Sequence, residues 1–283
     1  MEEKIAGGYV FFVPTPIGNR EDLTLRALRV LREADYIACE DTRHTRLLLD
    51  YYDIKKPLLS YHQHNENARA EELIALAKNG AQVAVVSDAG MPGISDPGQR
   101  LLIRCQETGL PYTVLPGPSA VTTAVVACGV GDGTFTFYGF LERRGAARER
   151  QLERMDSAFT TSVLYESPKR IRATVRELSA RWPERLFATA RELTKRHEEI
   201  QRFSGKDAPW ETLMEKGEYV LLIGPANPKT MDEAEVIAQL ESLKVEGLRS
   251  KEAVQRVSVV SGWPKNAVYQ LMVGQKKKHR EEK

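Results

Sequence analysis

The chain has 283 residues, of which 42% are hydrophobic and 28% charged, and its formal net charge is only +2. This length is enough for two domains or one large one, and so small a charge excludes any inference of nucleic-acid binding from the total alone. The apolar runs are too short to span a membrane, and the start, MEEKIAGG, lacks the basic and apolar blocks expected of a signal peptide.

Three cysteines stand far from one another, at Cys39, Cys105 and Cys128, and no two of them form a CxxC pair. An odd number of well-separated cysteines argues against a disulfide framework. We therefore expect a cytoplasmic protein with reduced thiols.

The first half of the chain alternates short apolar segments with helical patterns. Each apolar segment is followed by a loop of polar, glycine or proline residues. Such alternation predicts a parallel sheet with helices on both faces, and it gathers the loops at one edge of that sheet. The predicted strands are Tyr9–Val13, Tyr36–Cys39, Leu58–Ser60, Gln82–Val86 and Tyr112–Leu115.

The loop after the fourth predicted strand, from Ser87 to Gly98, is unusually long and rich in glycine, proline and aspartate. Gly90, Gly93 and Gly98 let the backbone approach a ligand or adopt positive φ angles. A simple strand-to-helix connection needs only about two to six residues. Because α/β proteins bind ligands where parallel strands end, we interpret this segment as a ligand-binding loop.

A second set of strand and helix patterns begins near residue 131 and predicts a mixed α/β domain. The glycine cluster at 129–133 is similar to a dinucleotide fingerprint, but no strand precedes it, so we interpret it as a linker. Farther on, Thr230 and Glu233 are predicted to form a capping box before a helix-turn-helix-like segment with a basic tail. A small helical cap with a solvated tail is the alternative. The expected domains are 1–130, 131–226 and 227–283.

Four ionisable residues follow the second strand within five positions, namely Glu40, Asp41, Arg43 and His44. At the carboxyl end of a strand, such a group can orient a polar substrate or transfer a proton. The alternative is an ordinary helix start that Asp41 or Thr42 caps.

Other chemistries find little support. The pair His62-x-His64 supplies too few ligands for a metal ion, and we expect no metal site. No GxSxG nucleophile elbow and no Walker sequence is present, which argues against a serine hydrolase and a nucleoside triphosphatase.

Seven short motifs carry a specific resemblance to a known family. They are VPTPIGN at 13–19, ACEDTRHT at 38–45, SYHQHNE at 60–66, VSDAGMPGISDPG at 86–98, PGPSA at 116–120, YESPKRI at 165–171 and RELTK at 191–195. In this order and spacing, the chain resembles the bacterial small-subunit ribosomal RNA (cytidine-2′-O)-methyltransferases, a branch of the tetrapyrrole-methylase superfamily. The resemblance implies two α/β domains, S-adenosylmethionine (AdoMet) in the cleft between them, a homodimer, and methyl transfer to a cytidine ribose hydroxyl at the decoding site.

The resemblance also implies which residues form the site. Cofactor-binding residues are expected in the first loop, the long glycine-rich loop, the PGPSA segment and the second domain, at Pro16, Asp88, Ala89, Gly90, Ile94, Ser119, Ala120, Tyr165 and Glu166. Substrate-binding residues are expected at Asn19, Glu40, Arg43, Arg143, Arg144, Arg170 and Lys195. Two segments depart from the family pattern: GFLERRG at 139–145 replaces the usual GFLP, and SPKR at 167–170 replaces SPHR. Both keep positive charge, so we expect altered RNA contacts rather than lost function.

A ribose hydroxyl is a poor nucleophile, so a base or a hydrogen-bond acceptor is expected beside it. Asp41, His44 and Asp88 are candidates, and the sequence does not choose among them. Two rival functions are a methylase of a small tetrapyrrole and a non-catalytic RNA-binding module. The first would not need the EDTRHT motif or the basic segment at 143–150, and the second would not need three ligand-type loops on one sheet edge.

Overall fold

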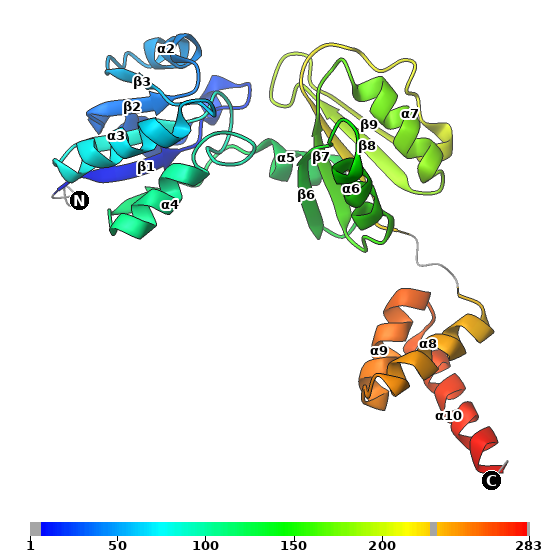
Figure 1. Cartoon of the computed structure of the whole chain (residues 1–283). Coiled ribbons are helices and arrows are strands. Elements are labelled where there is room, and N and C mark those ends of the chain that lie inside the picture. The colour runs from blue at the N-terminus through cyan, green and yellow to red at the C-terminus, as the bar shows by residue number, and fades with distance from the viewer. Residues whose placement is uncertain (1–6, 227–230, 282–283) are drawn as a thin grey trace. The chain divides into compact units, whose positions relative to one another are not determined.

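The computed structural model describes residues 7–226 and 231–281, with side chains in the last helix described as far as Gly274. Contacts divide the chain into two units (Figure 1). The first unit holds residues 1–156 and 160–224, and the second holds residues 157–159 and 225–283. All three cysteines are buried and unpaired.

The first unit begins with a parallel sheet whose strand order is β3-β2-β4-β1-β5. Its two central strands, β1 and β4, pair in register from Tyr9 with Gln82 to Val13 with Val86. They are almost entirely buried because helices cover both faces of the sheet. The strands are β1 (Tyr9–Val13), β2 (Tyr36–Cys39), β3 (Leu58–Ser60), β4 (Gln82–Val86) and β5 (Tyr112–Val114). The predicted parallel sheet is confirmed.

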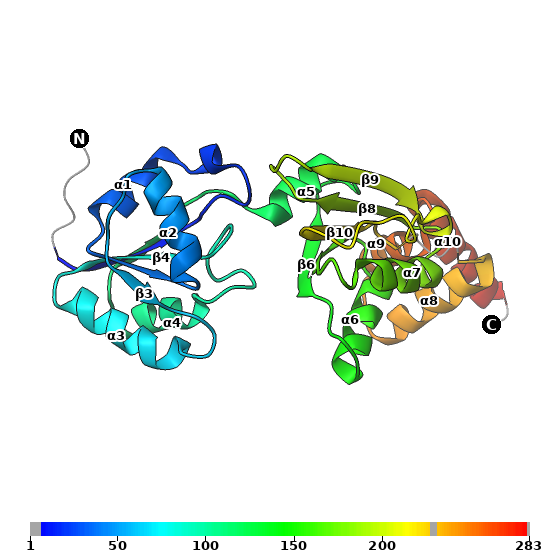
Figure 2. The same cartoon turned by 90° about the horizontal axis from the view of Figure 1, so that it is seen from above.

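Helices cover both faces of this sheet, as Figure 2 shows. Alternate residues of β1 point to opposite faces, so Phe11 packs in one core with the first pair of helices and Phe12 packs in another with the second pair. The first pair is α1 (Leu25–Glu33) and α2 (Thr42–Tyr51), and the second pair is α3 (Glu66–Lys78) and α4 (Gln99–Thr108).

The loops after β1 and β4 are bound together at the carboxyl edge of the sheet. Thr15 and Gly90 exchange two backbone hydrogen bonds of 2.9 Å each, and the Ser87 hydroxyl donates to the Gly90 carbonyl at 2.8 Å. From β1 the chain runs outward to β2 and β3, then returns to β4 and crosses to β5 on the other side. The direction of the connections thus reverses between β1 and β4, and open α/β sheets usually bind ligands at such a reversal, beyond the carboxyl ends of the strands.

A second, mixed sheet has the order β6-β7-β10-β8-β9, in which only β6 and β7 are parallel. Its strands are β6 (Phe135–Phe140), β7 (Thr161–Glu166), β8 (Leu186–Arg191), β9 (Glu199–Ser204) and β10 (Tyr219–Ile223). The helices α6 (Ala146–Asp156) and α7 (Ile171–Arg181) pack with one face in a single core. This sheet confirms the predicted mixed α/β architecture.

The other face of the second sheet is covered by α5 (Ala120–Cys128), which follows β5 of the first sheet directly in sequence. Ala124 and Val125 of this helix share a core with Ala188 of β8 and Leu222 of β10. The chain therefore passes from one core to the other between Val114 and Ala120. The boundary at residue 130 stays a prediction, and the packing of α5 favours an earlier one.

The second unit contains α8 (Glu233–Val245), α9 (Ser250–Ser261) and α10 (Lys265–Glu281), which enclose a small apolar core of their own. Its capping box lies two residues later than predicted. The Asp232 carboxylate accepts from the Glu235 backbone N–H at 2.8 Å, and the Glu235 carboxylate accepts from the Asp232 backbone N–H at 3.0 Å. The predicted box partner Thr230 lies outside the described residues, and Asp232 directly precedes the helix that it caps.

Candidate functional site

The loops after β1, β2 and β4 meet around Asp88. The Asp88 carboxylate accepts the backbone N–H of Asp41 at 3.2 Å, which joins the loop after β2 to the loop after β4. The Thr15 hydroxyl donates to the Ser87 carbonyl at 3.0 Å and fixes the residue just before Asp88. The position of Asp88 is thus set by contacts with both neighbouring loops.

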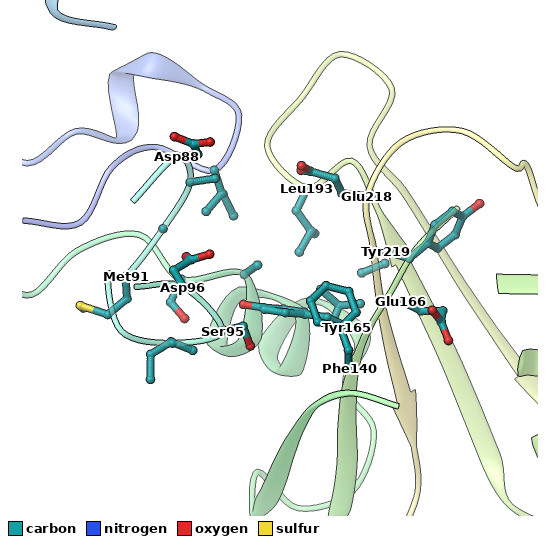
Figure 3. A pocket seen from close by; sticks show the side chains of 18 of the residues that line it. Asp88, Met91, Ser95, Asp96, Phe140, Tyr165, Glu166, Leu193, Glu218 and Tyr219 are labelled. Carbon is teal, nitrogen blue, oxygen red and sulfur yellow. The ribbon is translucent and has the colours of Figure 1, made fainter. Parts of the chain in front are cut away.

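A cavity of about 420 Å³ opens beside Asp88 (Figure 3). One wall comes from the loops of the first sheet and the other from strands of the second sheet. This size is within the usual range for small-molecule sites. The walls are Ile17, Glu40, Asp88, Ala89, Gly90, Met91, Ile94, Ser95, Asp96, Ser119, Ala120, Phe140, Tyr165, Glu166, Ser167, Pro168, Ala190, Leu193, Glu218, Tyr219 and Val220. We call this space the first cavity.

The charge in the first cavity is one-sided. Five of its residues carry a carboxyl group, and none of the described residues that line it is lysine, arginine or histidine. Burial, followed by the nearby Glu40 and Asp88, raises the pKa of Asp96 to about 7. Burial and Asp88 likewise raise the pKa of Glu40. A cationic ligand would relieve this repulsion between Glu40, Asp88 and Asp96.

The five carboxyl groups are not equivalent. Glu166 is 3% exposed and already accepts hydrogen bonds from the Ser167 backbone at 2.8 Å and from the Thr174 hydroxyl at 2.7 Å. In Figure 3, Asp88 and Asp96 extend from one wall, with Glu218 on the other, while the Glu166 carboxylate points away from Asp96. The ring of Tyr165 lies between the walls, and burial together with Asp96 and Glu218 raises its pKa to about 12.

All the predicted cofactor-binding residues line the first cavity except Pro16. Pro16 lines a second cavity of about 250 Å³, which adjoins the first. Gly90 has a φ of +81°, and a Cβ atom added there would lie 3.3 Å from Ile17 Cγ2. The backbone at this position therefore has a conformation and a close approach that favour glycine.

The structure separates the three candidate bases. Asp88 lines both cavities, and His44 lines the second. Asp41 lines neither, since its carboxylate caps α2 by accepting the Arg43 backbone N–H at 2.8 Å and pairs with the Arg43 guanidinium at 3.0 Å. These hydrogen bonds lower the pKa of Asp41 to about 2, which makes it a weak base at neutral pH.

The predicted substrate-binding residues fall into separate groups. Glu40 lines the first cavity and Lys195 the second. The Asn19 side chain caps the short 3-10 helix η1 (Arg20–Asp22), and its backbone N–H donates to the Thr194 hydroxyl at 2.9 Å. Arg170 is bound to the Leu141 carbonyl at 2.7 Å.

The remaining basic residues lie outside both cavities. The Arg43 side chain is 90% exposed, and Arg143 and Arg144 are exposed in the segment between β6 and α6. Arg148 of the same basic segment points inward instead and pairs with Glu177 at 2.6 Å. Only part of the basic segment is thus available to a partner.

Several cavity residues were not anticipated. Asp96 lies in the long glycine-rich loop. An acidic side chain among glycines and prolines could have marked it as a site residue in the sequence. Ser95 before it has a φ of +63°, a conformation that is uncommon outside glycine and often occurs at functional sites. Phe140 ends β6, Leu193 follows β8 and Glu218 precedes β10, so these residues reach the site from the second sheet and its loops.

Within residues 7–226 and 231–281, no group of three or more histidine, cysteine or acidic side chains is placed to hold a metal ion. The His62 and His64 rings lie 5.8 Å apart, centre to centre. Over the same residues, no helix is long and apolar enough to cross a membrane.

Comparison with known families gives one match over most of the chain. The tetrapyrrole (corrin/porphyrin) methylases match residues 9–209. Among curated proteins, ribosomal RNA small subunit methyltransferase I of Halalkalibacterium halodurans is 38% identical over 273 residues, covering 93% of this chain and 94% of the relative. The proteins of the same name from Bacillus subtilis and Haemophilus influenzae are 37% and 40% identical, over 93% of this chain and 93% and 96% of their own lengths.

Solved structures share the fold at low identity. Diphthine synthase superimposes with a TM-score of 0.61 at 13% identity, over 76% of this chain and 90% of its own. The methyltransferase CobJ gives 0.60 at 23% identity, over 78% and 95%. Uroporphyrin-III-C-methyltransferase of Thermus thermophilus gives 0.53 at 23%, over 77% and 92%.

Proposed function

This chain belongs to the tetrapyrrole methylase family and, within it, to the ribosomal RNA small subunit methyltransferases I, and we propose that it methylates the ribose 2′-hydroxyl of a cytidine at the decoding site of small-subunit rRNA. As a member, it is an AdoMet-dependent methyltransferase. We infer the RNA substrate from how much of the chain is similar to the rRNA enzymes. The relatives named for rRNA match 93% of the chain, whereas the match to the methylase family ends at residue 209. The likeness to the rRNA enzymes therefore continues into the C-terminal helical unit.

The first cavity suits AdoMet by its charge and its apolar contacts. AdoMet carries positive charge on its sulfonium and ammonium groups, and the described lining offers carboxyl groups without a basic residue. Apolar side chains such as Ile17 and Leu193 supply contacts for the uncharged parts of the cofactor. At Gly90 the absence of a side chain would let a bound cofactor approach the loop backbone, next to Ile17.

When bound, AdoMet supplies a methyl group whose in-line transfer forms an O–CH₃ bond as the S–CH₃ bond breaks. The residues of this chain hold the two reactants in position, which can account for much of the acceleration. The proton of the ribose hydroxyl must pass to an acceptor. Of the three candidates, Asp88 is the one that lines both cavities, so we propose it as the acceptor.

Three further features remain proposals. The helical unit of α8–α10 with its basic tail would bind RNA, and its side chains beyond Gly274 are outside the described residues. The chain would act in the cytoplasm, in line with three buried unpaired cysteines. The homodimer rests on the family resemblance alone.

The proposed function is tested by offering tritiated AdoMet with three acceptors in parallel: naked small-subunit rRNA, the assembled small subunit and a uroporphyrin-type tetrapyrrole. We expect label in rRNA from one of the first two, and nuclease mapping should find it on a cytidine ribose. Label in the tetrapyrrole alone would overturn the proposal in favour of a small-molecule methylase. Binding of RNA without transfer of label would favour a non-catalytic module.

A further inference from the structure

The two parts of the glycine-rich loop are held by different neighbours. The first part, with Asp88 and Gly90, is bound to the loops after β2 and β1. The last part, residues 94–96, lines the first cavity as well. The contacts that place this last part lead to the motif SYHQHNE at 60–66, which joins β3 to α3. This motif lies wholly within the described part of the chain and lines neither cavity.

Residues 93–98 form a closed loop at the end of the glycine-rich segment. The Gly93 backbone N–H donates to the Pro97 carbonyl at 3.1 Å, and the Gln99 side chain donates to the Gly93 carbonyl at 3.2 Å. Gly98 has a φ of +144°, and a Cβ atom added there would lie 3.0 Å from the backbone nitrogen of Gly93. The two ends of the closed loop therefore touch along their backbones. Whatever holds one end also places the cavity residues between them.

One carboxylate binds this closed loop to the neighbouring helix. Glu66 Oε1 accepts the Gly98 backbone N–H at 3.1 Å and the Tyr61 hydroxyl at 3.0 Å. Glu66 lies in the first turn of α3, where the helix dipole favours a negative charge. Hydrogen bonds to a charged acceptor are stronger than those between neutral groups. A single side chain thus links the start of α3 to the start of α4.

The neighbours of Glu66 tie it to the first sheet. Tyr61 is 1% exposed, and its backbone N–H donates to the carbonyl of Cys39 in β2 at 2.8 Å. Burial, followed by the Glu66 carboxylate, raises the pKa of Tyr61, so its hydroxyl keeps its proton and remains a donor at neutral pH. The Asn65 side chain donates to the carbonyl of Ser60 in β3 at 3.0 Å and secures the turn before α3. The contact with Gly98 is therefore built on two strands.

From these contacts we propose that Glu66 is a positioning residue for the methyl donor, because it holds Gly98 and thereby keeps residues 94–96 in the wall of the first cavity. The inference rests on the assignment of the first cavity to AdoMet, which is part of the proposed function, and specifies how one wall is kept in place. The part of the loop with Asp88 is bound by the loops after β1 and β2. Loss of Glu66 should therefore weaken AdoMet binding without displacing the proposed proton acceptor.

Three variants of α3 test this proposal. Glu66→Ala removes both hydrogen bonds, whereas Glu66→Gln keeps a side-chain oxygen that can accept them. Glu71→Ala is the matched control, because Glu71 also lies on α3 and joins it to Arg104 of α4 at 2.6 Å but lines neither cavity. AdoMet affinity of the whole chain is measured by calorimetry, and its stability is measured by thermal melts.

We expect Glu66→Ala to weaken AdoMet binding by about five- to fiftyfold, the size expected for the loss of a charge-assisted hydrogen bond. Glu66→Gln should lose less than about fivefold, and Glu71→Ala less than about twofold because its ion pair is exposed. In steady-state assays, Glu66→Ala should raise the KM for AdoMet and leave the KM for rRNA unchanged. Wild-type AdoMet affinity in Glu66→Ala would overturn the proposal.

A double variant separates positioning from stability. Glu66→Ala leaves the Tyr61 hydroxyl buried without this acceptor, which lowers stability. Tyr61→Phe combined with Glu66→Ala removes the hydroxyl as well, so the melting temperature should recover part of the loss. AdoMet affinity should stay low, because the Gly98 contact is still missing. If affinity returns together with stability, Glu66 has only a structural role and the proposal fails.

The pH dependence of binding gives a further readout. Burial, with Glu40 and Asp88 nearby, raises the pKa of Asp96 to about 7. A displaced closed loop would expose Asp96 to water, and its pKa would fall towards the ordinary value. The rise of AdoMet affinity with pH should therefore shift to lower pH in Glu66→Ala but not in Glu71→Ala. An unshifted profile in folded Glu66→Ala would mean that the closed loop keeps its position without this carboxylate.

Failure of the proposed function would give a different result. Calorimetry needs no RNA, so AdoMet binding by a wild-type chain that transfers no methyl group to rRNA would overturn the rRNA substrate alone. Unchanged AdoMet affinity in both folded Gly90→Val and Glu66→Ala would instead remove the whole glycine-rich loop from the AdoMet site, and the role of Glu66 with it.

Discussion

The two cavities of the first unit share Asp88 and Glu218 but differ in the charge that they offer. The first has five carboxyl groups and no basic residue among its described lining, whereas the second adds Arg20, His44 and Lys195 to the same two acids. The first site therefore suits a cation, whereas in the second site basic side chains offset the two acids. The difference teaches that one loop can present the same carboxylate to two cavities of different charge. Five predictions test this division.

The largest effect is expected at Gly90 in the wall of the first cavity. Gly90→Val puts a branched side chain at a φ of +81° and beside Ile17, so we expect no measurable AdoMet binding by calorimetry. Gly80→Val is the control, because Gly80 has a φ of +96° and no atom within 4 Å of an added Cβ. Both variants should lose about 1 kcal/mol or more of stability through backbone strain, but only the first should lose the cofactor. Unchanged affinity in folded Gly90→Val would remove this loop from the AdoMet site.

The next effect concerns the shared wall. Asp88→Asn keeps the side-chain shape but removes the proton acceptor, so kcat should fall by about a hundred- to ten-thousandfold. His44→Ala should lower kcat less, because His44 lines only the second cavity. Asp41→Asn should be nearly silent, since asparagine caps a helix about as well as aspartate. A large loss of kcat in Asp41→Asn with wild-type rates in Asp88→Asn would reverse this order and restore Asp41 as the base.

A smaller effect depends on pH. Since the pKa of Asp96 in the folded protein is about 7, its carboxyl group gains charge as pH rises from about 5.5 to about 8.5. AdoMet should therefore bind about three- to thirtyfold more tightly at the higher pH. S-adenosylhomocysteine lacks the sulfonium charge, and its affinity should change less. Asp96→Asn should remove the difference between the two ligands, and an unaltered pH profile in that variant would exclude Asp96 as its source.

The same shift has a consequence for stability without ligand. A raised pKa means that the folded chain binds the Asp96 proton more tightly than the unfolded chain does. The resulting contribution to the free energy of unfolding is fully present below the pKa of Asp96 in the unfolded chain. It is lost as pH rises through about 7, the pKa of Asp96 in the folded chain. Thermal melts of the wild type and Asp96→Asn should therefore diverge over this window, with the variant relatively more stable at the higher pH.

The smallest effect is expected outside both cavities. The Arg43 side chain is 90% exposed and pairs with Asp41, so Arg43→Ala should raise the KM for rRNA by about two- to tenfold and reduce its salt dependence by about one phosphate contact. AdoMet affinity should not change. A salt dependence equal to that of the wild type would mean that Arg43 contacts no phosphate.

Much of the first sheet was predictable because its strands are short apolar runs that end in glycine, proline or charged residues. The same logic located Asp88, Gly90 and the loop that contains them. Asp96 was missed, although it stands in that loop, because its burial depends on a wall from the second sheet. Glu218 was missed because the residue before an antiparallel strand has no local pattern that reveals what it will face.

The contact between α5 and the second sheet was also not predictable from the helix alone. A run such as AVTTAVVAC is apolar, but its sequence does not state which of two neighbouring sheets will bury it. The boundary was expected at residue 130 because α5 comes directly after the first sheet in the sequence. In the structure, Ala124 and Val125 are instead buried against β8 and β10 of the second sheet. Long-range packing of this kind is decided by tertiary contacts.

The position of α5 has a consequence for synthesis on the ribosome. The helix is made directly after the first sheet is complete, but its partner strand β10 ends at Ile223, about 100 residues later. At about 5–20 residues per second, the nascent chain carries an unshielded apolar helix for roughly 5–20 seconds. We expect this interval to be the one in which the growing chain is most exposed to chaperones and to aggregation.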